Sequence, residues 1–400
     1  MTQLSACLIV KNEATLLSRC LESIRSFVDE IIVVDTGSND GTVEIARNHG
    51  ALVYHYAWID DFSAARNESL CHAKGDWILY IDADETIDAV NAAKIRQVII
   101  RKDITAVTVR QCIPQQAGNV ATALYSEYCR LFRRHPAIRF EGKIHEQILP
   151  AIERQGGKVL CTDIVIHHWA YAASEEKKYR RAERNLRYLL TELDRVQDDP
   201  FLYFNLGMTY RELGQRDAAI RSFHLALAWD DGRIKRELLG QAHLNLAKIY
   251  LESGDGISSE RHAQMVAAFD PVNPLPDYIR ATLAVGKEQF KKAIFHLEKA
   301  LCIAKGKAGM FSNVELNLAQ IYLELGSCRC AAGDFLNAEH DFVCSINLDP
   351  SVAMPFLLLG NCRFMRGDLA GASEMFKRAL SLNPLLENAR QGLAMCHPNE

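Results

Sequence analysis

The sequence lacks any long apolar run: no window approaches the roughly 18 uninterrupted apolar residues that a membrane-spanning helix needs. It also lacks an excess of basic residues, since 46 Lys and Arg stand against 50 Asp and Glu, a net charge of −4. A nucleic-acid binder needs such an excess to neutralise phosphates. The apolar run 8–10 is too short for a signal peptide. We therefore expect a cytoplasmic protein with no membrane span and no nucleic-acid partner.

Closely spaced cysteine pairs are nearly absent. None of the twelve cysteines forms a C-x-x-C pair, and only Cys328 and Cys330 lie near each other in sequence. Disulfide frameworks and zinc sites have regular spacings, which this pattern does not offer. The cysteines are predicted to be reduced core residues, with a metal or redox role as the alternative.

The 400 residues, 48% hydrophobic and 24% charged, exclude a disordered chain and suggest two or three domains. In the first part, short runs rich in Ile and Val alternate with helical patterns. The predicted strands are 4–10, 30–35, 52–56 and 77–82, and the predicted helices are 16–27, 42–49 and 64–73. This alternation is typical of a parallel α/β sheet. The later runs 106–112, 127–133 and 159–167 favour an antiparallel extension of that sheet.

The pattern changes near residue 172. A highly charged helix is predicted over 174–196, and the sequence after it is almost wholly helical. The predicted fold class is therefore α/β followed by all-α. The predicted domains are 1–172, a linker helix over 173–198, and a helical domain over 199–400.

The helical part repeats itself. Predicted helix pairs begin at Pro200, Gly240, Pro274, Ala319, Ala353 and Glu387, with spacings of 40, 34, 45, 34 and 34 residues. Small residues such as Gly207 and Gly360 recur where two helices would cross, and aromatic residues such as Phe223 and Phe376 recur where the next pair would pack. The pattern resembles the tetratricopeptide repeat, which implies a helical solenoid whose stacked pairs bury a shared core. Such an array suits binding rather than catalysis.

Residues capable of chemistry gather in the first part. A predicted buried strand ends in the D-x-D motif Asp82-Ala83-Asp84. Ligands of open α/β sheets bind at the carboxyl ends of strands, and paired carboxylates are oxygen ligands for Mg²⁺ or Mn²⁺. The alternative for this motif is a cap of the next helix.

Two neighbouring strands also end in polar residues. Asp35 ends the second strand, at a position from which it can accept hydrogen bonds from a base or ribose, and Asn12 and Glu13 follow the first. Arg66, one turn into a helix, can reach a pyrophosphate. Its alternative role is an ion pair with Asp60 or Asp61.

Three segments together resemble the family 2 glycosyltransferases of the GT-A type, over roughly residues 4–172. They are VDTGSNDGT (34–42), W-x-x-DFSAARN (58–67) and ILYIDADE (78–85). The resemblance implies a Rossmann-like transferase domain, a nucleotide-sugar donor, usually a UDP-sugar, and Mg²⁺ or Mn²⁺. It implies that Asn12, Glu13 and Asp35 line the nucleotide pocket, with Arg66 near the diphosphate, Asp82 near the ribose and Asp84 on the metal.

Two more segments are similar to a subgroup that carries helical repeats behind the transferase domain. One runs from Arg130-Leu131-Phe132-Arg133 to residues 140–146, and the other is IHHWAY at 166–171. Family members of this type invert the anomeric centre, which implies a carboxylate base. We assign that role to Glu146, with an ion pair to Arg130 or Arg133 as its alternative, and name His168 as a second metal ligand. His145 and His167 are reserve ligands.

The acceptor is open at this point. Relatives of this architecture resemble bacterial enzymes that glycosylate bacteriocin-like peptides and enzymes that build lipopolysaccharide core. A helical-repeat groove suits an extended chain, which favours a peptide or protein acceptor over a glycan. The sugar, a hexose or N-acetylhexosamine, is not indicated. The repeats could instead mediate homo-oligomerisation, and a catalytically silent repeat scaffold is the rival function.

Overall fold

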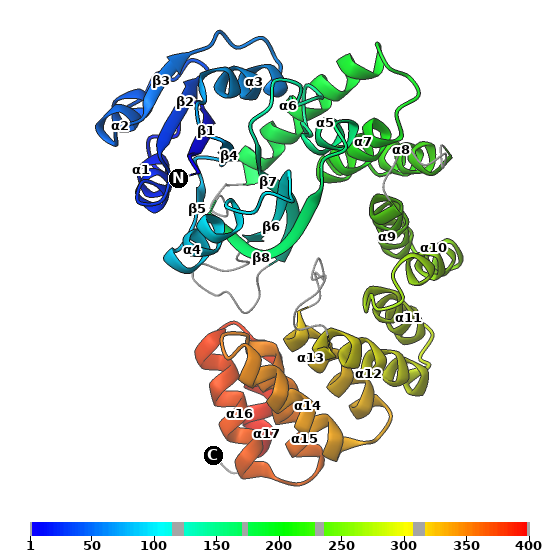
Figure 1. Cartoon of the computed structure of the whole chain (residues 1–400). Coiled ribbons are helices and arrows are strands. Elements are labelled where there is room, and N and C mark those ends of the chain that lie inside the picture. Colours follow the sequence, from blue (N-terminus) through cyan, green and yellow to red (C-terminus); the bar gives the residue numbers. More distant parts are fainter. Residues whose placement is uncertain (1, 114–123, 170–174, 229–235, 307–316, 398–400) are drawn as a thin grey trace. The chain divides into compact units, whose positions relative to one another are not determined.

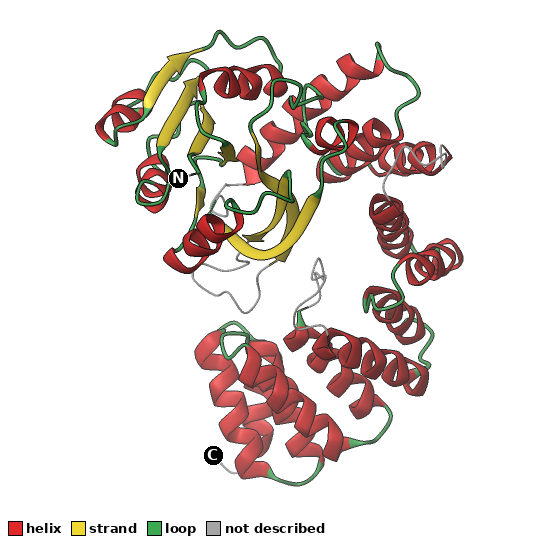
Figure 2. Ribbon diagram, in the orientation of Figure 1, coloured by secondary structure: helices red, strands yellow, loops and turns green. Residues whose placement is uncertain are grey.

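The computed structural model describes residues 2–113, 124–169, 175–228, 236–306 and 317–397 (Figure 1). The chain forms two compact units, residues 1–219 and 220–400. Within these described ranges, the first unit contains a mixed sheet and the second contains helices without strands (Figure 2). No helix in the described part of the chain is both long and apolar enough to cross a membrane.

The first unit begins with the predicted alternation of strands and helices. Strands β1 (Leu4–Val10), β2 (Glu30–Asp35), β3 (Leu52–His55) and β4 (Trp77–Tyr80) are parallel neighbours in the order β3-β2-β1-β4. Between them lie helices α1 (Leu17–Ile24), α2 (Thr42–Asn48) and α3 (Phe62–His72). The α/β prediction for this part of the chain is confirmed.

The sheet continues through β7 (Leu124–Arg133), β6 (Ala106–Ile113), β8 (Val159–His168) and the short β5 (Glu85–Thr86). Strand β7 runs antiparallel to β4 and β6, as predicted. Strand β8, however, pairs with β6 in parallel, so the antiparallel expectation is wrong there. The end of β7 and the start of β8 both lie beside Ala106. The connection over residues 134–158, which contains helix α5 (Leu149–Arg154), therefore keeps the chain at the same end of the sheet and places β8 on the other side of β6, parallel to it.

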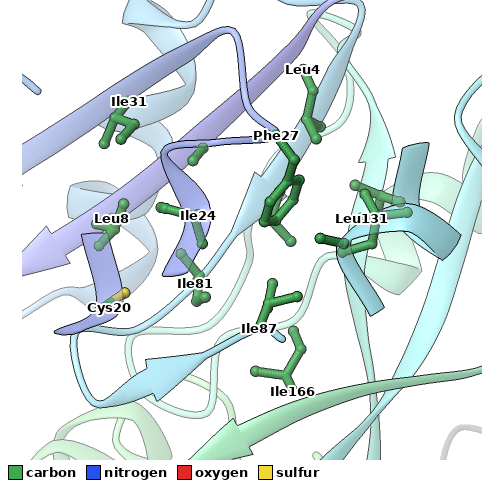
Figure 3. Packing of buried hydrophobic residues seen from close by; sticks show 14 of the residues in the cluster. Leu4, Leu8, Cys20, Ile24, Phe27, Ile31, Ile81, Ile87, Leu131 and Ile166 are labelled. Atoms are coloured by element: carbon green, nitrogen blue, oxygen red, sulfur yellow. The ribbon is translucent and has the colours of Figure 1, made fainter. Parts of the chain in front are cut away.

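Apolar side chains cover both faces of this sheet. Helix α1 buries Leu17, Cys20, Leu21 and Ile24, which share one face of a 3.6-residue period. Figure 3 shows Cys20 and Ile24 beside strand residues of the same cluster. Helix α4 (Ala89–Val98), absent from the sequence prediction, starts at its N-cap Asp88 and adds Ile95 to this core. The packed sheet gives the polar residues at its edge a fixed support.

Two further helices belong to the first unit. Helix α6 (Glu175–Leu193) and helix α7 (Pro200–Glu212) pack in an apolar cluster that includes Tyr188, Leu202 and Ile144. The compact units divide at residue 219, and the domain bounds 1–172, 173–198 and 199–400 stay a prediction. Ala170 and Tyr171 of the IHHWAY segment lie outside the described residues.

The remaining helices are α8 (Arg216–Ala228), α9 (Arg236–Glu252), α10 (Gly256–Phe269), α11 (Leu275–Val285), α12 (Phe290–Gly306), α13 (Leu318–Ala331), α14 (Phe335–Leu348), α15 (Ala353–Met365), α16 (Leu369–Leu382) and α17 (Glu387–Cys396). In this helical part, α9 packs against α10, α11 against α12, α13 against α14 and α15 against α16. Every predicted repeat start falls within four residues of a helix start. At Gly360 an added Cβ would lie 2.7 Å from the Phe376 ring, which explains the small residue at the helix crossing.

Candidate active site

The polar residues predicted to bind a ligand follow three neighbouring parallel strands. Strand β1 lies between β2 and β4, and Val10 pairs with Asp35 in register. Asn12, Asp35 and Asp82 come at or just after the carboxyl ends of these strands, which share one edge of the sheet. The topology therefore brings together residues that are 70 positions apart in sequence, as expected.

Asn12 and Asp35 shape a single loop. Asn12, with φ of 57°, accepts a hydrogen bond from Asn39 N (2.8 Å) and donates its own N–H to Ser38 Oγ (2.9 Å). Asp35, only 3% exposed, accepts one from Ser38 N (3.1 Å). Glu13 N donates to Thr42 Oγ1, at the start of α2 (2.8 Å). The three residues predicted to line the nucleotide pocket thus surround one hydrogen-bonded loop.

Asp82 is held by two arginines. Arg66 Nη2 donates to its Oδ1 (2.8 Å), and Arg130 Nη1 and Nη2 donate to its Oδ2 (3.1 and 3.2 Å). Burial by itself would raise the pKa of Asp82, but the charges of Arg66 and Arg130 hold it below the usual range of an aspartate. Asp82 is therefore a fixed carboxylate at the strand end.

Glu85 lies behind this group and is fully buried. Its carboxylate accepts hydrogen bonds from Arg130 Nη2 (2.7 Å), Gln111 Nε2 (2.5 Å) and Asp82 N (2.9 Å). Burial raises the pKa of Glu85, and the nearby Arg130 charge opposes that rise. These contacts fold residues 82–85 into a tight loop, so Asp82 and Asp84 keep a set orientation.

Glu146 pairs with Arg66 and not with the partners considered from sequence. Arg66 Nε donates to Glu146 Oε1 (2.5 Å), and the Glu146 side chain is 13% exposed. Arg130 is occupied by Asp82 and Glu85, and Arg133 donates to backbone carbonyls. The alternative ion pair of Arg66 with Asp60 or Asp61 is also wrong, because Asp61 caps α3 and Asp60 binds Tyr188.

Asp84 and His168 lie side by side. Strands β5 and β8 pair Glu85 with His168, and Trp169 N donates to Asp84 O (2.8 Å). This places His168 Nε2 3.3 Å from Asp84 Oδ2, with both side chains about one-fifth exposed. Burial raises the pKa of Asp84, and the neighbouring His168 opposes the rise. The pair presents a carboxylate oxygen and an imidazole nitrogen to the same point.

The two reserve histidines lie elsewhere. His167 Nε2 is 3.4 Å from Asp88, the cap of α4, and His145 is exposed in a left-handed conformation with φ of 54°. No group of three or more His, Cys, Asp or Glu side chains with metal-binding geometry occurs among the residues that the structure describes. Of the three histidines considered from sequence, His168 is thus the one paired with Asp84.

Comparison with known proteins decides the family of this sheet domain. Residues 5–148 match the model of the Glycosyl transferase family 2, and residues 202–232 match that of a tetratricopeptide repeat. The first region is a family 2 glycosyltransferase domain. The chain thus combines a transferase domain with a helical repeat, as its sequence pattern indicated.

Two similar proteins each match a little more than half of this chain. A TPR repeat-containing protein of Synechococcus elongatus is 40% identical over 227 residues, which are 55% of each chain. The SPbeta prophage-derived glycosyltransferase SunS of Bacillus subtilis is 29% identical over 218 residues, which are 53% of this chain and 50% of SunS. The chain therefore spans about half the length of the curated relatives it matches. Among solved structures, MamA is 20% identical, with a TM-score of 0.39 over 47% of this chain and 94% of that chain.

Sequence reasoning missed several residues that support the transferase site. Arg130, Glu85 and Gln111 lie on or beside strands β7, β5 and β6, and together they hold Asp82. Two sequence features could have indicated them: Arg130 is the first residue of the Arg-Leu-Phe-Arg segment, and Glu85 directly follows the D-x-D motif. Nothing in the sequence marks Gln111, because only the pairing of β8 with both β6 and β5 brings it near Glu85.

Proposed function

We propose that this chain is a metal-dependent, inverting glycosyltransferase. It moves a hexose or N-acetylhexosamine from a UDP-sugar to a peptide or protein acceptor. The observation that carries the proposal is the Asp84–His168 pair, 3.3 Å apart and two residues from an Asp82 that two arginines hold in place. A ligand-binding D-x-D loop needs this fixed geometry, whereas a merely structural loop does not.

The donor set of this pair fits Mn²⁺ or Mg²⁺. One carboxylate oxygen and one imidazole nitrogen leave most coordination positions open, as in sites where substrate phosphates and water complete the shell. The imidazole favours Mn²⁺, the softer of the two ions. A bound divalent cation would stabilise the charge that develops on the departing nucleoside diphosphate. Asp84 and His168 would hold the ion, and Glu85 would keep their loop in position through Asp82 N and Arg130.

The other edge residues serve the donor and the acceptor in this proposal. Asp35, Asn12 and Glu13 bind the nucleoside, with Asp82 beside the ribose. Arg66 lies next to the diphosphate, but two of its nitrogens already bind Asp82 and Glu146, so its main contribution is to orient these two carboxylates. Glu146 removes the proton from the acceptor nucleophile as it attacks the anomeric carbon on the face opposite the leaving group.

The repeats support a peptide or protein acceptor. Stacked helix pairs present an extended surface along which a chain can lie. We also propose a cytoplasmic location, because all twelve cysteines lie in the described ranges and are thiols rather than disulfides. Self-association through the repeats is a separate possibility that the same surface offers.

The first experiment titrates the full chain with UDP-sugars, with and without Mn²⁺. We expect Mn²⁺-dependent binding that weakens by about a hundredfold in Asp84→Asn, since a metal contributes several kcal/mol to charge stabilisation. Asp163→Asn is the matched control, because Asp163 is exposed and forms an ion pair with Lys94. If the UDP-sugar binds equally well with and without Mn²⁺, the metal role is contradicted. If no UDP-sugar binds, the result favours the catalytically silent scaffold.

The second experiment tests the base. Glu146→Gln should lower transfer by about 10²- to 10⁴-fold while donor binding stays the same, because the amide cannot accept the acceptor's proton. Glu153→Gln, on the exposed side of α5, is the control and should transfer normally. If Glu146→Gln transfers sugar at a rate close to that of the control, Glu146 is not the base.

A further inference from the structure

Helix α6 contacts two loops of the transferase domain, one before Arg66 and one before Glu146. We propose that α6 is a positioning element of the transferase site: Tyr188 and Glu192 fix these two loops and thereby set the Arg66–Glu146 pair. The contacts between α6 and the two loops lie within residues 1–219. The effect of α6 on turnover rests on the proposed function.

Tyr188 fixes the first loop, residues 58–61. Its hydroxyl donates to Asp60 Oδ1 (2.6 Å), which also accepts from Trp58 Nε1 (2.8 Å). Asp60 has φ of 59°, a left-handed conformation that side chains other than glycine adopt at a cost unless neighbours hold them. The Tyr188 ring is buried against Phe62 at a centroid distance of 6.5 Å. The loop conformation therefore depends on a residue of α6.

The second loop, residues 142–146, is tied both to the first and to α6. Phe62 N donates to Lys143 O (2.8 Å), and Ser63 Oγ donates to Gly142 O (2.6 Å). From the other side, Lys143 N donates to Glu192 Oε2 (3.4 Å). Ile144 is buried in the apolar cluster that contains Tyr188 and Leu189 of α6. Both loops are thus held against one face of this helix.

These loops lead directly to the charged pair of the site. Asp61 caps α3 through Ala64 N, and Arg66 follows within the first turns of that helix. Glu146 lies two residues after Ile144. The 2.5 Å contact between Arg66 Nε and Glu146 Oε1 therefore joins two segments that α6 positions together. A shift of about 1 Å in a reacting group can cost up to about a hundredfold in rate, so the loops need this support.

Other side chains of α6 show that its role differs along the helix. Arg180 and Glu176 form an exposed i,i+4 pair with each other, and Tyr179 is about half exposed. Tyr188 and Leu189, in contrast, are at most 5% exposed. The described side chains in the first half of α6 are thus exposed except for Ala182, and the second half contacts the transferase domain.

The test compares Tyr188→Phe with Tyr179→Phe in the full chain. Both changes remove one hydroxyl from the same helix, but only the first removes a hydrogen bond to Asp60. We expect amide exchange in residues 58–66 and 141–147 to rise about three- to tenfold in Tyr188→Phe, as loss of one such bond predicts, and not in Tyr179→Phe. With sugar transfer as the readout, kcat should fall about tenfold while the donor KM changes less than about twofold.

Asp60 provides a second pair of variants. Asp60→Asn keeps an oxygen that accepts from Tyr188 and Trp58 and tolerates a left-handed backbone, so it should behave like the unaltered chain. Asp60→Ala also removes the hydrogen bond from Trp58, so its effect should be at least as large as that of Tyr188→Phe. The double variant should be no worse than Asp60→Ala, because the Tyr188–Asp60 bond is already absent there.

Two results would overturn the proposal. Exchange in Tyr188→Phe that equals the Tyr179→Phe control in both segments would show that α6 does not set the loops. Faster exchange with an unchanged kcat would show that α6 stabilises the loops without positioning the site. If the unaltered chain transfers no sugar, the proposed function fails, and the exchange comparison still decides whether α6 fixes the loops.

Discussion

The two compact units use buried charge in different ways. In the transferase domain, ion pairs join distant segments into one group: Arg66 binds Glu146 across 80 residues of sequence, and Arg130 binds Asp82 across 48. In the repeats, a charged pair such as Arg363 with Glu339 spans 24 residues and joins adjacent helix pairs. The transferase domain therefore concentrates its charges at one sheet edge, while the repeats distribute theirs along the array.

This difference follows from the two architectures. A parallel sheet brings the ends of distant strands to one edge, so that polar groups there share partners. A repeat array contacts only its nearest neighbours, so each charged pair acts locally. Removal of one charged residue should thus disturb the whole transferase site, whereas in the repeats it should disturb only the contact between two adjacent helix pairs.

Arg130→Met should have the largest effect on stability. It leaves the fully buried Glu85 without a cation and leaves Asp82 with Arg66 alone, and loss of one partner of a buried ion pair costs about 3–5 kcal/mol. The matched change Arg363→Met leaves Glu339 partly exposed and still paired with Arg366, and should cost less than about 1 kcal/mol. Urea unfolding of both variants measures the difference, and equal losses would refute the contrast.

Gly360→Ala should have an intermediate effect. Its Cβ would lie 2.7 Å from the ring of Phe376, and such overpacking typically costs about 1–3 kcal/mol. Gly306→Ala, at the end of α12 with open space around its Cβ, is the control and should be neutral within about 0.5 kcal/mol. Hydrogen exchange should become faster in α15 and α16 and stay unchanged in the transferase domain, because each helix pair contacts only its neighbours.

The smallest of these effects is that of mild acid, which should lower the free energy of unfolding of the repeats before that of the transferase domain. Burial, with further contributions from His243, His224 and Arg261, lowers the pKa of His262 to about 4 from 6.5, and its Nδ1 lies 2.9 Å from His243 Nδ1. The unfolded state then binds more protons than the folded state between these values. The free energy of unfolding should therefore fall as the pH drops from about 6.5 to about 4.

His262→Gln should flatten this pH dependence when unfolding of the repeats is followed at pH 7 and pH 5. The carboxylate of Asp82 has a folded pKa below its unfolded value of 3.8, so its contribution is lost only at lower pH. The transferase domain should consequently keep that contribution at pH 5. An unchanged slope in His262→Gln would show that this histidine is not the source of the acid sensitivity.

Much of the fold was predictable from local pattern. Strands β1 and β2 were predicted with the bounds that they have, and the repeat starts were found to within four residues. Helix α4 and the parallel pairing of β8 with β6 were missed. Apolar periodicity reports how a segment buries its own face, but it does not report which strand it will join.

The sequence by itself determined the alternation of strands and helices, the helical repeat and the motifs that place Asp35, Asp82 and Asp84 at strand ends. Tertiary structure alone decided the partners: Arg66 binds both Asp82 and Glu146, Arg130 binds Asp82 and Glu85, and Tyr188 of α6 binds Asp60. The physical reason is the different distance along the chain over which the two kinds of interaction act. Backbone preferences and periodicity act over a few residues, whereas an ion pair depends on which distant segments the packed core brings within about 3 Å.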